Sequence, residues 1–398
     1  MKQRHLGLKE NWPLFTLLVL MSAFVGAMVG FERSLLPIIT SSWGMAEAQS
    51  SLIMVATFGG SKAVANLFTG HLLTSISRKW TLVVGWCIAA AVPYLLLTMN
   101  APWMAITANV ALGISQGITW SATVMMKIDI AGKKLRGTAM GLNESAGYLA
   151  VGGASALAAS FMDTNGDLRY ILFATLIIVL LAIIIALFLL PNTQPWAELE
   201  ARKEYENSTA VAKNIFVFAS WENRSLRLLN IGGLVNNAND AIVWAVLPSL
   251  LLFHGESLTT VGILTGIHAG LWGVGQFFTG PLSNNGKIRN LLWWGLSIQG
   301  MALLFMSTAT TLWLPYILLG LGTAMVYPTF LVGVSNLSHP SWRPKSLATY
   351  RFWRDMGYVI GALLGYLSLQ LHAPSSAFIY IAILTLIASS MIRFSQLE

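Results

Sequence analysis

Twelve apolar segments run through this chain of 398 residues, and each is about as long as a membrane-spanning helix. A helix needs about 20 mostly apolar residues to cross the hydrocarbon core of a bilayer. Charged residues make up only 10% of the chain, whereas a water-soluble domain carries about 25%. We therefore expect an all-α membrane protein with helices near 14–40, 48–75, 79–98, 101–127, 136–161, 168–190, 225–252, 258–283, 288–307, 310–335, 343–371 and 374–393.

Positive charges predict the orientation of these helices, because loops on the cytoplasmic side of a membrane are enriched in Lys and Arg. With both termini in the cytoplasm, the inner segments hold 19 of the 24 Lys and Arg residues, and the outer loops hold only Arg169. The sequence thus predicts a multi-pass protein of the cell inner membrane with both termini cytoplasmic. The inner set is Lys2, Arg4, Lys9, Arg78, Lys79, Lys127, Lys133, Lys134, Arg136, Arg202, Lys203, Lys213, Arg224, Arg227, Lys287, Arg289, Arg343, Lys345 and Arg393.

Charge and cysteine content exclude several classes of protein. The net charge of +8 is spread over short basic clusters between apolar runs, which argues against a nucleic-acid partner. The single cysteine, Cys87, lies inside an apolar run and provides neither a disulfide framework nor a metal motif. The basic N-terminus resembles a signal peptide, but the apolar run that follows is too long and lacks a cleavage site. We interpret it as a retained first helix.

The sequence contains an internal repeat. Gly70 matches Gly280, and Gly147 matches Gly357, at the same offset of 210 residues. Equal offsets at separated places indicate that a unit of six helices was duplicated. Parallel six-helix repeats are the plan of one large class of membrane transporters. The expected domains are an N-terminal six-helix bundle, a cytoplasmic linker and a C-terminal six-helix bundle at 1–193, 194–222 and 223–398.

The loop between the second and third segments carries a recognisable motif. In transporters of the major facilitator superfamily it typically reads Gly-x-Leu-x-Asp-Arg-x-Gly-Arg-Lys, and this chain resembles them in Gly70, Arg78 and Lys79. The segment 133–141 is also similar to the loop that precedes the fifth helix of that family. Thr74 replaces the aspartate of the motif, which in the family helps to latch the cytoplasmic side. A latch in this chain must therefore be weaker or made differently.

The resemblance covers essentially the whole chain. Within the superfamily, the chain resembles the bacterial 12-helix transporters that export drugs and metabolites. It implies two pseudo-symmetric six-helix halves, a small-molecule substrate, a lipid bilayer as the surroundings, a monomer and no cofactor. In that architecture helices 1, 4, 7 and 10 line the cavity, and helix pairs 2/11 and 5/8 pack across the halves. The same comparison makes Gly70, Arg78 and Lys79 candidates for gating between the halves.

Ionisable side chains inside the hydrocarbon cost about 2.5–3.5 kcal/mol each on insertion scales, so each needs a partner or a function. From a rise of about 1.5 Å per residue, Lys62 and Asp355 lie at similar depth on helices 2 and 11. We therefore expect an ion pair between them that gates the cytoplasmic side. Glu144 and His268 lie at similar depth on helices 5 and 8, which predicts a second contact. Either pair could instead simply fasten the halves together.

Arg351, Arg354 and Asp355 lie on one face of the eleventh helix, because they are spaced at i, i+3 and i+4. One arginine is expected to pair with Asp355. The other could hold an anionic substrate through charge-assisted hydrogen bonds or extend toward the cytoplasm. Glu144 stands at the repeat position of Arg354 and has the opposite charge.

Three carboxyl groups are candidates for proton coupling. Asp240 has no cation near it in its helix and stands in a polar run that should face the cavity. An unpaired carboxyl in such a place is a candidate proton carrier. Glu144 and Glu32 are its competitors, although Glu32 and Arg33 near the outer end are interpreted first as a mutual pair or an outer gate. The remaining candidates for the substrate cavity are Gln116, Trp120, Asn236, Asn237, Trp244 and Tyr327.

No catalytic constellation or phosphate-binding loop appears, so we do not expect an enzyme. The leading hypothesis is a proton-coupled antiporter that exports a small amphipathic drug-like or metabolic compound. The second is uptake or exchange of a small organic anion, supported by Arg33, Arg351 and Arg354. A remote third is a membrane sensor or scaffold that transports nothing.

Overall fold

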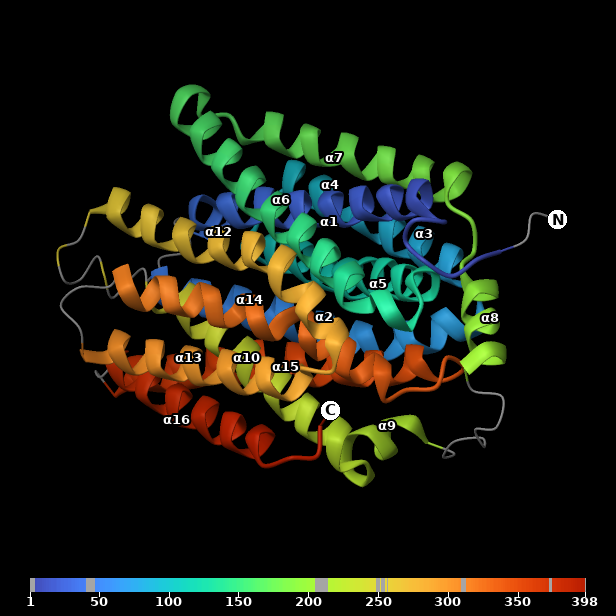
Figure 1. Ribbon diagram of the computed structural model, residues 1–398. Helices are drawn as coiled ribbons and strands as arrows, with labels where there is room; N and C mark the ends of the chain where they lie inside the picture. The colour runs from blue at the N-terminus through green and yellow to red at the C-terminus, as the bar shows by residue number, and fades with distance from the viewer. Residues whose placement is uncertain are drawn as a thin grey trace.

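The structure is a computed structural model, and it describes residues 4–40, 47–204, 214–247, 251, 255, 257–308, 313–371 and 374–397. Lys2 and Lys213, two of the positive charges counted above, lie outside these residues. Within them every regular element is a helix, which confirms the expected all-α fold. The long helices run side by side in one bundle (Figure 1).

The N-terminal half consists of six membrane helices. The third is made of α3 and α4, and the sixth is made of α7 and a π-helical turn. Their bounds are α1 Trp12–Thr40, α2 Glu47–Ser75, α3 Arg78–Ala89, α4 Ala91–Leu97, α5 Pro102–Ala131, α6 Arg136–Asn165 and α7 Leu168–Ile184. A π-helical turn at Ile185–Leu189 continues α7. Phe173, Ile177 and Phe188 are exposed along this last helix, which gives lipid an apolar surface.

The C-terminal half repeats this plan. Its helices are α10 Arg224–Ala245, α12 Leu258–Leu282, α13 Ile288–Thr308, α14 Trp313–Asn336, α15 Arg343–Gln370 and α16 Pro374–Arg393. Between the halves lie α8, Gln194–Glu204, and the short α9, Ile215–Val217, with a π-helical turn at Phe218–Glu222. The exact domain boundaries stay a prediction.

Small residues explain how the helices approach one another within each half. A Cβ atom on Gly26 of α1 would lie 2.0 Å from the carbonyl oxygen of Gly147 in α6. A Cβ atom on Gly357 of α15 would lie 2.1 Å from the carbonyl oxygen of Leu234 in α10. Only glycine permits such backbone contact between membrane helices. Because Gly147 and Gly357 are repeat partners, the same contact is built twice.

Across the halves, α2 packs on α15 and α6 packs on α12, as the resemblance implied. The α2–α15 contact runs the length of the helices, from Gly70 beside Ala348 to Leu52 beside Gly365. The α6–α12 contact is also close, because a Cβ added to Gly280 would lie 2.6 Å from the Cα atom of Gly141. These two interfaces position the site described below.

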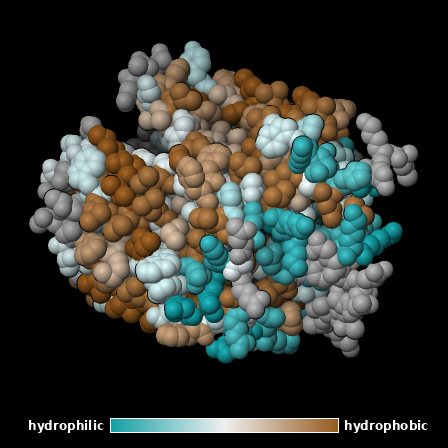
Figure 2. Space-filling model, in the orientation of Figure 1, coloured by the Kyte–Doolittle hydropathy of each residue, from teal (hydrophilic) through white to brown (hydrophobic). Residues whose placement is uncertain are grey.

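Eight of the described helices are long and apolar enough to cross a membrane by length and composition. The helices α5, α10, α12 and α15 are not among them. Three of these, α5, α10 and α15, carry the buried charged and amide side chains of the protein's centre. Hydrophilic side chains also gather on the surface at the end that carries α8, called here the linker end (Figure 2).

Candidate functional site

Five aromatic rings meet in the middle of the bundle. Tyr148 of α6 stacks on Trp272 of α12 with ring centroids 3.8 Å apart. Tyr327 of α14 lies 5.0 Å from Trp272, and Trp120 of α5 lies 5.3 Å from Tyr148. Trp244 of α10 stacks on Trp272 at 6.1 Å. The five rings, called here the aromatic cluster, come from both halves.

Three residues predicted to line the cavity, Trp120, Trp244 and Tyr327, thus reach the centre. Trp272 was not predicted, because a tryptophan in an apolar segment gives no signal of its own. Its spacing of four residues from His268 could have indicated it, since i and i+4 share a helix face.

Arg33 does not pair with Glu32. Its guanidinium instead lies 4.0 Å from the ring centroid of Trp244 in the other half, and 5.8 Å from that of Phe58. A cation over an aromatic face is attracted by the ring quadrupole. Glu32 is 3% exposed, and neither of its carboxylate oxygens has a hydrogen-bond partner among the described residues. The expected mutual pair is therefore wrong, and Arg33 joins the halves through a ring.

Asp355 pairs with Arg354 and not with Lys62. Arg354 donates from Nε to Asp355 at 2.8 Å, and its Nη2 lies 2.6 Å from the same carboxylate oxygen. Asn66 of α2 donates to the other carboxylate oxygen, Oδ2, at 2.7 Å. Asn237 of α10 donates to Oδ1, the oxygen that Arg354 contacts, at 3.1 Å. The expected ion pair is wrong because Asn66, one turn beyond Lys62, meets Asp355 instead. Asp355 thereby connects both halves.

Lys62 has aromatic neighbours in place of that acid. Its Nζ lies 5.1 Å from the ring centroid of Phe58 and 5.6 Å from that of Trp120. Among the described residues no carboxylate oxygen lies within 4.0 Å of it. The side chain is 5% exposed and lies buried at the edge of the aromatic cluster.

Arg351 contrasts with Arg354. It is 1% exposed, and none of its three guanidinium nitrogens has a hydrogen-bond partner among the described residues. Its nearest acid is Glu144, whose Oε1 lies 3.9 Å from Nη2, which is an ion pair without a hydrogen bond. Of the two arginines, Arg354 therefore pairs with Asp355, and Arg351 has no hydrogen bond among the described residues.

Glu144 is held by its own half. Trp120 donates from Nε1 to its Oε1 at 3.0 Å, and Asn143 donates to the same oxygen at 2.6 Å. Its Oε2 has no hydrogen-bond partner among the described residues. The expected contact with His268 is absent from the part of the chain that is described, because His268 lies beside Trp272 at 5.8 Å and its Nε2 is without a partner there.

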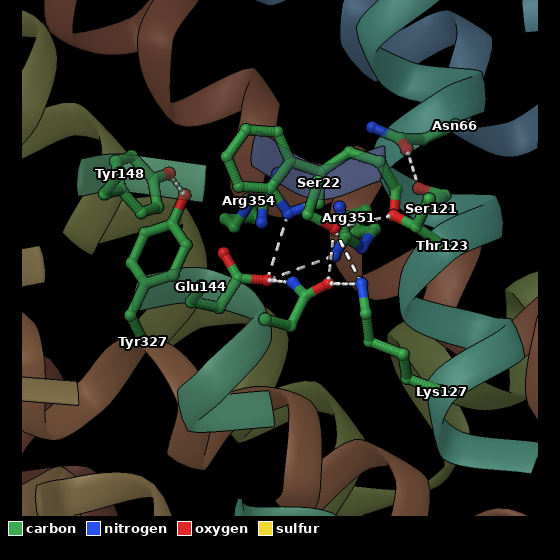
Figure 3. A network of polar contacts seen from close by, with 12 residues as sticks. Ser22, Asn66, Ser121, Thr123, Lys127, Glu144, Tyr148, Tyr327, Arg351 and Arg354 are labelled. Carbon is green, nitrogen blue, oxygen red and sulfur yellow. Dashed lines mark hydrogen bonds and ion pairs between the residues drawn. The ribbon is translucent and has the colours of Figure 1, made fainter. Parts of the chain in front are cut away.

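Lys127 belongs to the same network, although the sequence placed it in a cytoplasmic loop. It is fully buried, and its Nζ donates to Asn143 at 2.5 Å and to Ser22 of α1 at 2.7 Å. Asn143 thus connects Lys127 to Glu144. Figure 3 shows Lys127, Glu144 and Arg351 in one set of polar contacts. The sequence missed this lysine because α5 extends through Ala131, beyond the apolar run.

In the polar run of α10, some side chains form hydrogen bonds to other helices, and one carboxylate oxygen has no hydrogen-bond partner among the described residues. Asn236 accepts a hydrogen bond of 2.8 Å from Gln299 of α13, and Asn239 donates to Gln299 at 3.0 Å. These amides hold α10 in place. Asp240 is 2% exposed, and its Oδ2 has no hydrogen-bond partner among the described residues. Gln116 of α5 donates to the Val25 carbonyl of α1 at 2.9 Å, which leaves its Oε1 without a partner in the described part.

The three residues of the loop motif have different neighbours. Arg78 pairs with Asp129 of α5, Nε to Oδ2, at 3.2 Å. Lys79 donates to the carbonyl of Leu187 at 2.6 Å at the end of α7. Both contacts lie within the N-terminal half. Gly70 does face the other half, since a Cβ there would lie 2.5 Å from that of Ala348.

The two halves are joined at the linker end through α8. The carboxylate of Glu200 accepts hydrogen bonds from Arg343 of α15 at 2.8 Å and 3.0 Å, and it also pairs with Arg136 of α6. Burial alone would raise the pKa of the Glu200 carboxyl, but the hydrogen bonds from Arg343 and the charges of both arginines lower it below its ordinary value. This three-residue contact, called here the linker clasp, connects both halves to α8.

A model of the Major Facilitator Superfamily matches residues 15–227 and 229–396 of the chain. No curated protein matches it in sequence. Among solved structures, the human organic anion transporter MFSD10 (TETRAN) is similar with a TM-score of 0.80 at 15% identity, covering 95% of this chain and 98% of that one. The transporter FucP in the outward conformation gives 0.75 at 14% identity, covering 96% and 98%. The proton:xylose symporter XylE, bound to 6-bromo-6-deoxy-D-glucose, gives 0.69 at 14%, covering 96% and 95%.

Proposed function

Because the chain belongs to the major facilitator superfamily, we propose that it is a secondary transporter that moves a small amphipathic organic anion across the membrane by alternating access. The observation that carries this proposal is the side chain of Arg351. A guanidinium buried without hydrogen bonds is costly, and Glu144 at 3.9 Å offsets only part of that cost. A carboxylate, sulfonate or phosphate would satisfy the guanidinium with two parallel hydrogen bonds.

The aromatic cluster supports an apolar or aromatic body for the same solute. Binding sites for small molecules are lined mainly by apolar and aromatic side chains, with a few polar groups that fix the orientation. Here Trp120 donates to Glu144, so the cluster and the charged network share a residue. An amphipathic anion would place its charge at Arg351 and its body among the rings. The human organic anion transporter shows that this fold accommodates anions in another protein.

Transport of permanently charged probes into proteoliposomes tests the proposal. Suitable probes are aryl sulfonates such as labelled benzenesulfonate, with benzenesulfonamide as the neutral analogue and benzyltrimethylammonium as the cation. After subtraction of entry into protein-free liposomes, which the neutral amide crosses by itself, we expect protein-dependent entry of the anions alone. Arg351→Gln should lower the rate roughly tenfold or more, because a hydrogen bond to a charged group contributes about 1.5–3 kcal/mol. Arg393→Gln removes an arginine far from the centre, over Trp293, and should change little. Equal entry of the amide or the cation would overturn the proposal.

Proton-coupled export of an uncharged or cationic amphipathic compound, the leading hypothesis from the sequence, is the second candidate. Asp240 favours it, because a buried carboxylate oxygen without a partner can bind and release a proton. Compound-dependent proton movement, followed with a pH-sensitive dye, should then disappear in Asp240→Asn. Asp167→Asn, at the exposed start of α7, is the control. Proton movement with cations and none with anions would favour proton-coupled export over anion transport. If neither cations nor anions crossed the membrane, a sensor that transports nothing would be favoured.

We propose further that the linker end faces the cytoplasm of an inner membrane and that the protein works as a monomer. The Lys and Arg residues that predict this orientation include Lys133, Lys134, Arg202 and Lys203, which are all at this end. A cysteine at Lys134 in a Cys87→Ser background should react with an impermeant maleimide only after the membrane is opened. Reaction in intact cells would reverse the orientation.

A further inference from the structure

We infer that Lys127, Glu144 and Arg351 form the binding site for the charged end of a monovalent organic anion, and that the charge of this site makes the protein an exchanger. The inference rests on the proposed anion transport and adds the charge of the solute and the kind of cycle. With all three groups ionised, Lys127 and Arg351 carry two positive charges and Glu144 carries one negative charge, so the formal charge of the empty site is about +1.

The three groups act as one unit because polar contacts connect them and because all three are buried. Arg351 lies 3.9 Å from Glu144, and the Asn143 amide connects Glu144 to Lys127 through hydrogen bonds of 2.6 Å and 2.5 Å. The side chains of Glu144 and Arg351 are 0% and 1% exposed, and Lys127 is 0% exposed as a residue. At such burial water cannot screen the charges.

No further acid balances the site. The adjacent Asp355 already forms an ion pair with Arg354, with 2.6 Å between Oδ1 and Nη2. Lys62 over Trp120 adds positive charge at the edge of the cluster. Neither Asp240 nor Glu32 lies within 4.0 Å of a cation among the described residues. Among the described residues, the three-residue site of Lys127, Glu144 and Arg351 therefore lacks one negative charge, and Lys62 lies outside that site.

The missing charge determines which form of the carrier changes conformation readily. A buried charge without a counter-charge is unfavourable, so a conformation that encloses the empty site is rarely populated. A monovalent anion makes the site neutral, and the loaded carrier can then close and reopen on the other side. The empty carrier returns slowly, so inward movement of one anion requires outward movement of another.

The same charge explains selection against dianions. Glu144 has a free Oε2 in the site and would repel a second negative charge. In Glu144→Gln the three positions carry a charge of about +2, and a dianion becomes the neutralising ligand. In Lys127→Met the empty site is neutral, and its return no longer limits the cycle.

The test is uptake of labelled benzenesulfonate into proteoliposomes that are either empty or preloaded with unlabelled benzenesulfonate. We expect preloading to accelerate entry roughly tenfold or more, since each tenfold corresponds to about 1.4 kcal/mol between the two return steps. In Lys127→Met this acceleration should shrink toward one. In Glu144→Gln, 1,3-benzenedisulfonate should become the stronger competitor, while in wild type it competes weakly. Glu198→Gln on the exposed side of α8 is the matched control and should behave as wild type.

The outcomes separate the inference from the function on which it rests. If no anion enters under any loading, anion transport itself is wrong. If anions enter equally fast with and without preloading, transport stands and exchange is overturned. If wild type takes the disulfonate as well as the monosulfonate, the assignment of a monovalent ligand is overturned. The competition assay with Glu144→Gln decides the question even where Lys127→Met does not fold.

Discussion

The hydroxyl of Tyr148 donates a hydrogen bond of 2.6 Å to the hydroxyl of Tyr327, across the interface between the two halves. Both phenols are buried, and their rings meet edge to face at 5.3 Å. This bond and the stack of Tyr148 on Trp272 both join the two halves at the centre of the bundle. Opening must therefore break a contact whose contribution can be measured.

Tyr148→Phe keeps the ring and removes this hydrogen bond. Because a net hydrogen bond contributes about 0.5–1.5 kcal/mol and an unpaired partner adds to the loss, we expect a decrease of about 1–2 kcal/mol in the stability of the closed form. The melting temperature in detergent should fall by a few degrees. Tyr170→Phe on the exposed face of α7 should leave it unchanged. A melting temperature equal to that of wild type would show that the bond does not stabilise the closed form.

Asp355→Asn should be among the most destabilising isosteric changes in the protein. It removes the charge that pairs with Arg354 and weakens the acceptors for Asn66 and Asn237. Breaking a buried pair by removing one partner costs about 3–5 kcal/mol. Urea or thermal unfolding in detergent should show the loss, and Asp167→Asn, an exposed cap, should show almost none. Equal effects of the two variants would contradict the central role given to Asp355.

Glu200→Gln should open the linker end. The substitution leaves Arg136 and Arg343 without their shared carboxylate, so the closed form should lose about 3–5 kcal/mol. A cysteine at Ala348 beside Gly70, in a Cys87→Ser background, should then react faster with maleimide. Glu198→Gln on the same helix is the control. Unchanged reactivity would show that the linker clasp does not hold this end closed.

The linker clasp also has a defined response to pH. Because the pKa of Glu200 in the folded protein lies below its ordinary value, its contribution is fully present above the ordinary pKa, about 4.3. It is lost as the pH falls through the lower folded value. Because the thiolate is the reactive form of cysteine and its fraction falls with pH in every variant, the two proteins are compared at each pH. The ratio of Ala348-site reactivity in Glu200→Gln to that in the protein with Glu200 should stay constant from neutral pH down to about pH 5. A ratio that already falls toward one near neutral pH would mean that another group controls the closure.

Gly280→Ala should separate α6 from α12. The new Cβ would lie 2.6 Å from the Cα atom of Gly141 and 2.7 Å from the Gly137 carbonyl oxygen, both of which are backbone atoms. Backbone cannot move aside as a flexible side chain can, so the linker end should fail to close. Transport should fall severalfold. Gly266→Ala, in the same helix with nothing within 4 Å of the added Cβ, should transport normally.

The spans and their pairing across the halves could be predicted because hydrophobic length and the internal repeat are long-range patterns that single side chains do not disturb. The partners of the buried charges could not. Lys62 and Asp355 were matched by depth alone, but one helical turn separates Lys62 from Asn66, the residue that Asp355 contacts. A rise of 1.5 Å per residue does not say which side chain of a turn points at a neighbour.

Other parts of the site gave no signal in the sequence at all. Lys127 was counted with the basic loop because Lys133 and Lys134 follow it closely. Glu200 stood among several acids and bases of the linker, and nothing in that composition marks the one that becomes buried. Its function depends on Arg343, which is 143 positions away in sequence. Such a contact exists only once the two halves have come together.

The linker clasp has a consequence for what the two halves do on their own. Arg136 and Arg343 face one another from opposite halves with like charge, so the bare surfaces at this end are mutually repulsive. The charge that offsets this repulsion comes from a third element that belongs to neither half. The connecting segment is therefore a counter-ion as well as a tether, and a change that displaces α8 would restore the repulsion between the two arginines without altering either half.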